Sequence, residues 1–185
     1  MWLQGRRSDR CWKTAHPEDG TMALISRRWY PLAESGDAFL KSAHFRYEQS
    51  VETAAPAERI WEVLTGYELL HWVPVWTGLR WGSPPFGVGT VREVTLAGVL
   101  TVREQFFRWV EGQRFSFGGL EATLPGLRNV AEDWAIVPTP SGSRLTWTLA
   151  IGARPWAVPL IWLSGPIIRG VQRRVLRTLR EHVKN

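Results

Sequence analysis

Hydrophobic and polar residues alternate with a period of two along much of the middle of the chain. Residues 45–52 place Phe, Tyr, Gln and Val at every second position, and residues 144–151 repeat the pattern with Leu, Trp, Leu and Ile. This period is typical of a strand with one buried and one solvated face. Similar runs between turn residues predict further strands at 76–82, 90–96, 99–110, 114–118 and 128–137. The pattern therefore predicts an antiparallel sheet of about six to seven strands.

The period changes to that of a helix at both ends of this strand-rich region. A helix predicted to start at Pro56 carries one apolar stripe at residues 60–64 and is closed by Gly66, and residues 67–73 form a second short helical stretch that stops at Pro74. From Ile168 to Val183, apolar residues recur at helical spacing with arginines between them. We expect two short helices after the first strand, and a long terminal helix whose apolar face covers the sheet.

The first 42 residues show no sustained period and are predicted to be a loosely ordered extension of a domain at 43–185. Met22 is an alternative start, so residues 1–21 carry no functional assignment. Cys11 is the only cysteine, which favours a reducing compartment. The first residues are rich in charge and lack the apolar run of a secretory signal. We expect a cytoplasmic protein.

The formal net charge of +6 is concentrated at the end of the chain. Residues 156–185 hold six basic side chains and one acid, whereas residues 45–155 are close to neutral. A nucleic-acid binder would spread basic residues over its binding face, so this distribution argues against one. The terminal arginines predict a solvated helix face, with weak contact to an anionic membrane as the alternative.

Several common kinds of chemical site are missing from the sequence. The four histidines are scattered without metal-ligand spacing, and a Gly-rich phosphate loop and a Gly-x-Ser-x-Gly motif are both lacking. We therefore expect neither a metal nor a cofactor, and no obligate protein partner is evident.

Twelve tryptophans are far more than a domain of this length needs to fill a core. A hollow for an apolar or aromatic ligand is usually walled by such side chains. Core packing is the alternative for any single ring. The predicted ligand-binding aromatic residues are Tyr47, Trp72, Trp76, Trp81, Phe106, Trp134 and Trp147, with Trp109, Trp156 and Trp162 in the same aromatic group.

Charged residues within apolar strands are the second candidate signal. Arg92 and Glu104 each alternate with apolar residues, and they would meet if both point inward. A buried pair of this kind could orient a ligand, and a buried carboxylate could serve as acid or base. The alternative is an ion pair on the solvated face of the sheet, which would contribute little to stability. Glu132 and Asp133 precede Trp134 and are secondary candidates; Asp133 joins Glu104 as a catalytic candidate because it alternates with alanines.

Five stretches in this order resemble the START-like (Bet v 1-like) or SRPBCC superfamily, in its polyketide cyclase/dehydrase-type branch. The resemblance implies an α+β helix-grip fold, in which a curved antiparallel sheet wraps a long C-terminal helix around a ligand cavity. The matching stretches are 51–64, 69–76, 87–92, 102–109 and 143–149.

The fold alone does not decide the function, because this superfamily includes both carriers and enzymes. Our first hypothesis is a carrier of a small hydrophobic molecule such as a lipid, isoprenoid or polyketide-like compound. The second is a polyketide cyclase, aromatase or dehydratase that uses Glu104 or Asp133 to move a proton. A structural or stress-associated domain with a vestigial cavity is the third.

Overall fold

The computed structural model describes residues 28–66, 73 and 75–183. Within this part, eight strands form one antiparallel sheet in the order β2-β8-β7-β6-β5-β4-β3, with β1 paired to β6 beside that path. The strands are β1 (Tyr30–Pro31), β2 (Phe45–Thr53), β3 (Trp76–Trp81), β4 (Val91–Leu96), β5 (Leu100–Val110), β6 (Arg114–Ala122), β7 (Leu127–Thr139) and β8 (Gly142–Ala153). The predicted antiparallel sheet is confirmed.

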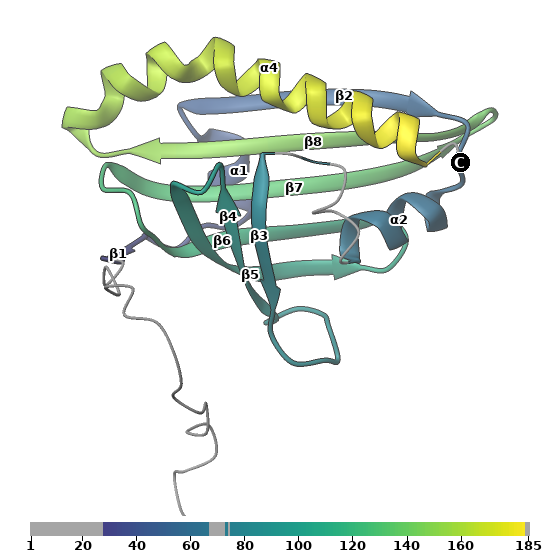
Figure 1. Ribbon diagram of the computed structural model, residues 1–185, viewed down its shortest axis with the longest axis horizontal. Helices are drawn as coiled ribbons and strands as arrows, with labels where there is room; N and C mark the ends of the chain where they lie inside the picture. The colour runs from purple at the N-terminus through teal and green to yellow at the C-terminus, as the bar shows by residue number, and fades with distance from the viewer. Residues whose placement is uncertain (1–27, 67–72, 74, 184–185) are drawn as a thin grey trace, which may run out of the picture.

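One long helix, α4 (Val158–His182), crosses the concave face of the curled sheet along β2 and β8 (Figure 1). It follows the short 3-10 turn η1 (Pro155–Ala157), and Pro159 occupies its first turn while Pro166 lies inside it. Val175, Leu176 and Leu179 on its inner side are buried in the core. The helix-grip arrangement expected from the sequence is confirmed.

Helix α2 (Ala57–Thr65) closes one end of the concave face. Ile60 and Val63 are fully buried, so the apolar stripe read from the sequence is the face that packs. Pro56 precedes the helix in an extended conformation, and Gly66 follows it. The second short helix expected at 67–73 falls almost wholly outside the described residues.

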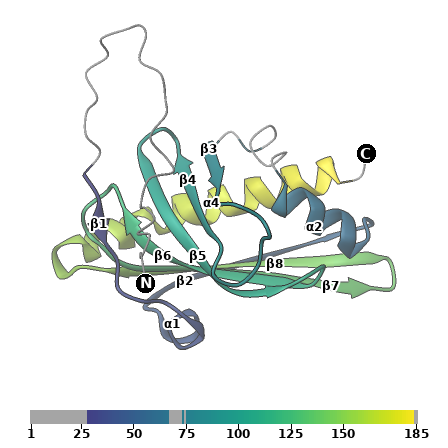
Figure 2. The same cartoon turned by 90° about the horizontal axis from the view of Figure 1, so that it is seen from below.

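A short helix also packs on the convex face of the sheet, which the sequence did not predict. Helix α1 (Asp37–Ser42) lies on the side of the sheet opposite α4 (Figure 2). Leu40 is buried there against Ala131 and Ala150, small residues that let the helix approach. Residues 30–42 were predicted to belong to a loosely ordered extension, but this part of the chain packs on the sheet. The folded unit therefore begins before the expected boundary at residue 43.

Strand β5 contains a bulge that changes the side on which residues lie. Phe106 pairs with Phe117 and Arg108 pairs with Ser116, so Phe107 is an extra residue between them. Phe107 packs with α1 on the convex face, while Phe106 and Trp109 contact each other on the concave face. A single strand thus supplies aromatic side chains to both faces of the sheet.

Candidate functional site

The hairpin of β4 and β5 brings Arg92 and Glu104 together. Ala97 and Gly98 adopt positive φ angles of 49° and 70°, as a tight turn between antiparallel strands requires. Arg92 and Glu104 are equally far from Gly98 along the chain, and they face each other across the strand pair. Arg92 Nε donates to Glu104 Oε2 over 2.8 Å, and each residue is only 6% exposed. Of the two alternatives for this pair, the structure therefore shows the buried one.

Aromatic rings surround the Arg92 guanidinium. Its central carbon lies 5.0 Å from the ring centres of Trp81 and Phe106 and 4.5 Å from that of Phe117. A desolvated guanidinium over such rings gains cation–π attraction, which offsets part of the cost of burial. The arrangement fixes the cation on the concave face.

Glu132 on β7 is the second carboxylate on this face. Two indole groups donate to its Oε2: Trp134 Nε1 over 3.1 Å and Trp147 Nε1 over 2.8 Å. The two indole rings stack with centres 4.5 Å apart and planes inclined by 17°. Two tryptophans therefore hold one carboxylate oxygen in a fixed position.

Burial raises the pKa of both carboxyl groups on the concave face, Glu132 and Glu104. It raises the pKa of Glu132 to about 8, helped by the negative charge of Glu104 and opposed by Arg92 and the indole N–H groups. Burial also raises the pKa of Glu104, although the charge of Arg92 and its hydrogen bond act to lower it. Since Arg92 bonds directly to Glu104, Glu132 is the carboxyl that holds a proton near neutral pH.

The aromatic residues predicted for the site form a contact network around these charges. Trp81 stacks on Phe106 with ring centres 5.5 Å apart, and Trp76 lies 6.1 Å from Trp147 and 6.3 Å from Trp134. Trp81, Phe106, Trp134 and Trp147 are buried. In the described part of the chain these rings pack against one another, and a hollow walled by them stays a prediction. Trp72 lies outside the described residues.

Asp133 is not part of this site, so its selection as a catalytic candidate was wrong. Its side chain points to the convex face, where Ser116 Oγ donates to Oδ1 over 2.6 Å and Arg114 Nε donates to it over 2.8 Å. Arg108 also pairs with Asp133 and links it to Asp37 of α1. Ala131, two residues before Asp133, packs beneath α1 against Leu40 and faces no ligand.

The sequence offered a signal for Glu132 that the choice of Asp133 overlooked. Residues two apart on a strand share a face, and Trp134 was already assigned to the interior. Glu132 therefore had to accompany Trp134, as the structure places it. Phe117, which lies over Arg92, was not predicted, although Phe115 and Phe117 alternate with polar residues and mark one apolar face of this strand.

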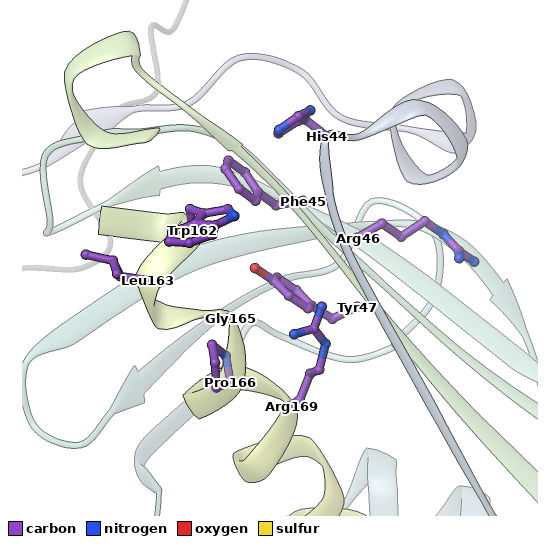
Figure 3. A pocket seen from close by; sticks show the side chains of 9 residues that line it. All are labelled: His44, Phe45, Arg46, Tyr47, Trp162, Leu163, Gly165, Pro166 and Arg169. Carbon is purple, nitrogen blue, oxygen red and sulfur yellow. The ribbon is translucent and has the colours of Figure 1, made fainter. Parts of the chain in front are cut away.

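Tyr47 lies apart from the tryptophan network, in a groove between the start of β2 and the first half of α4 (Figure 3). This groove encloses about 520 Å³. The Arg169 guanidinium lies 5.2 Å from the centre of the Tyr47 ring. Trp162 borders the groove but is 69% exposed, and Trp156 is 63% exposed. These two members of the aromatic group therefore lie on the surface and outside the tryptophan network.

The described residues contain no group of three or more His, Cys, Asp or Glu side chains placed to hold a metal ion. Among the helices in that same part of the chain, none combines the length and apolar character needed to cross a membrane.

The curled sheet, the gripped helix and the acidic concave face define a helix-grip protein. The chain belongs to the family described as polyketide cyclase/dehydrase and lipid transport, whose model matches residues 44–184. The uncharacterized protein Rv2574 of Mycobacterium tuberculosis is 33% identical over 155 residues, which cover 83% of this chain and 93% of that protein. Mb2604 of Mycobacterium bovis matches to the same extent.

Solved structures share the fold at low sequence identity. The Zhui aromatase/cyclase from Streptomyces sp. R1128 superposes with a TM-score of 0.64 and 16% identity, covering 76% of this chain and 93% of that one. The structure of Ara h 8.0201 gives a TM-score of 0.55 and 15% identity, covering 75% of this chain and 97% of that one. These likenesses support the fold.

Proposed function

We propose that this protein binds a small, largely apolar molecule with one oxygen function on the concave face, and acts as its carrier. The oxygen function would lie at Glu132, beside the Arg92–Glu104 pair. The apolar body would lie against the tryptophans and α4. Burial of apolar ligand surface there would contribute about 25 cal/mol per Å² before ordering costs.

The observation that carries the proposal is the position and accessibility of Glu132. It occupies the middle of the concave face, on a strand row between Phe117 and Leu149. Its nearest concave-side neighbours along β7 and β6, Trp134 and Phe117, are buried, yet Glu132 keeps part of its surface accessible. A carboxyl held by two indoles and still reachable is a suitable contact for a ligand oxygen.

A second polar group, the indole N–H of Trp81, supports a ligand site in the same region. Trp81 Nε1 is buried and lacks a hydrogen-bond acceptor within the described part of the protein. A buried donor without an acceptor costs about 1–3 kcal/mol. Trp81 lies opposite Arg92 on the adjacent strand. An acceptor atom on the ligand would relieve this cost.

A pair of probes tests the proposal. 2-Naphthol and naphthalene differ by one hydroxyl, and quenching of tryptophan fluorescence reports their binding. We expect 2-naphthol to bind more tightly, and Glu132→Leu to weaken it about tenfold, the value of one hydrogen bond. Naphthalene binding to the same variant is the internal control. Trp147→Ala should weaken both probes.

Equal affinity of both probes, or equal weakening of both by Glu132→Leu, would contradict a polar anchor at this position. Native mass spectrometry of the protein purified from its own host would identify the natural ligand by mass.

A cyclase or dehydratase is the second candidate function, and the proton on Glu132 favours it. A carboxyl with a pKa of about 8 can donate a proton to a substrate carbonyl near neutral pH, while Arg92 stabilises the developing negative charge. Glu104→Gln and Glu132→Gln separate the two functions. A carrier keeps its ligand affinity in both variants, whereas an enzyme keeps affinity but loses turnover of a polyketide-like substrate.

A further inference from the structure

The outer side of α4 is divided into two halves of different chemistry. Its first half and the preceding turn expose large apolar side chains, namely Trp156, Leu160, Trp162, Leu163 and Ile167, each between 63% and 69% exposed. Its second half exposes arginines, namely Arg169, Arg173, Arg174, Arg177 and Arg180. The sequence predicted only the arginine face.

The exposed apolar residues of α4 include one stripe along the helix. Leu160, Leu163 and Ile167 follow each other at spacings of three and four, which places them in one stripe along the helix. Trp162 lies on the side of α4 next to the groove that reaches Tyr47, which Leu163 also lines (Figure 3). We call this surface the α4 apolar patch. An exposed patch of this kind usually marks an interaction surface.

We infer that the α4 apolar patch docks this protein on an anionic lipid bilayer. The charge around the patch is the first reason. The only acid between residues 156 and 185 is Glu181. On the neighbouring strand β2, Glu48 and Glu52 are already paired with Arg46 and Arg144. The arginines of α4 therefore present positive charge that anionic headgroups complement.

The types of apolar residue are the second reason. Tryptophan favours the boundary between headgroups and acyl chains, because its ring is apolar and its N–H group is polar. Leu163 and Ile167 would enter the acyl region, while Arg169 and Arg173 extend to the headgroups. An interfacial helix needs this combination of aromatic, aliphatic and basic side chains. A protein partner is the competing occupant, and the test includes it.

The groove beside the α4 apolar patch is the third reason for a lipid bilayer as the occupant. It is bordered by Trp162, Leu163 and Pro166 on one side and by Phe45 and Tyr47 on the other. Tyr47 lies opposite Leu149, which lies opposite Glu132, so groove and candidate site share one row of the concave face. If the carrier function proposed above holds, the docked face is also where an apolar ligand would enter.

Vesicle flotation of the full chain tests the docking itself, independently of any ligand. The probes are vesicles of phosphatidylcholine alone and of phosphatidylcholine with phosphatidylglycerol at a ratio of about 3:1. We expect at least tenfold stronger partitioning to the anionic vesicles, because each basic side chain near such a surface adds attraction. High salt should reduce this preference.

Two double variants and a matched control locate the contact. Leu163→Gln with Ile167→Gln should lower binding to anionic vesicles at least tenfold. Val88→Gln with Val99→Gln is the matched control, because these valines are 68% and 67% exposed on turns far from α4 in sequence. Arg173→Gln with Arg174→Gln should remove the preference for anionic lipid.

The inference is overturned if the wild-type protein binds neither kind of vesicle. It is equally overturned if the α4 and control variants bind alike. A protein that ignores vesicles but forms a dimer which Leu163→Gln with Ile167→Gln dissolves would assign the patch to a second copy of the chain. None of these readouts depends on a bound ligand, so failure here leaves the proposed carrier function standing.

Discussion

Replacement of Glu132 by glutamine tests whether the proton on this buried carboxyl controls stability. The ordinary pKa of a glutamic acid is 4.5, and in the folded protein that of Glu132 is about 8. The folded state therefore holds a proton that the unfolded chain has already released between these pH values. Stability must fall as pH rises through this window, and the loss is complete above the folded pKa.

The magnitude follows from the difference between the two pKa values. Each unit corresponds to about 1.4 kcal/mol, so full expression of the difference would cost about 5 kcal/mol above pH 8. Glu132 keeps some contact with solvent, which screens part of this cost. We expect wild-type protein to lose about 2–4 kcal/mol between pH 5 and pH 9. Glutamine has similar shape and accepts the indole N–H groups without titrating, so Glu132→Gln should lose much less.

Urea unfolding followed by circular dichroism at pH 5, 7 and 9 measures the effect as a difference between variant and wild type. Glu111→Gln, in the exposed turn between β5 and β6, is the matched control and should follow the wild-type curve. The reasoning is refuted if Glu132→Gln and wild type lose stability in parallel with rising pH. A parallel loss would mean that another group carries the proton.

Two further substitutions test the framework around the site. Arg92→Met leaves Glu104 buried without its cation and should lower the free energy of unfolding by about 3–5 kcal/mol; a loss below about 1 kcal/mol in urea unfolding would contradict a buried pair. Gly142→Ala adds a methyl group 2.2 Å from the Thr53 carbonyl oxygen at a φ of 137°. It should cost about 2–4 kcal/mol in thermal unfolding, whereas Gly87→Ala, with no atom within 4 Å, should cost little. Equal melting temperatures would disprove the clash.

Much of the fold could be predicted because local patterns and tertiary packing agree. The alternation in β2 and β8 and the apolar stripe of α2 coincide with the faces that are buried. The pairing of Arg92 with Glu104 was also predictable. A hairpin turn at Ala97 and Gly98 fixes which residues face each other, without knowledge of the rest of the chain.

The features that the sequence did not predict depend on contacts between segments that are far apart in the chain. Nothing in the sequence around β7 shows that α1 covers its outer side, so alanines on both sides of Asp133 were taken for an interior face. The exposed half of α4 was missed for a related reason. Leu160, Leu163 and Ile167 are apolar, and only the structure shows that the sheet is occupied by other residues of the helix.

The extra residue in β5 makes chain length at that point part of the design of the protein. Loss of Phe107 would remove the bulge, because Arg108 would then follow Phe106 in regular register opposite Ser116. Arg108 and Trp109 would keep their present faces, and Trp109 would stay beside Trp61. Only the convex face would lose a ring, the one that packs with α1, so the extra residue is what allows this strand to supply aromatic side chains to both faces of the sheet.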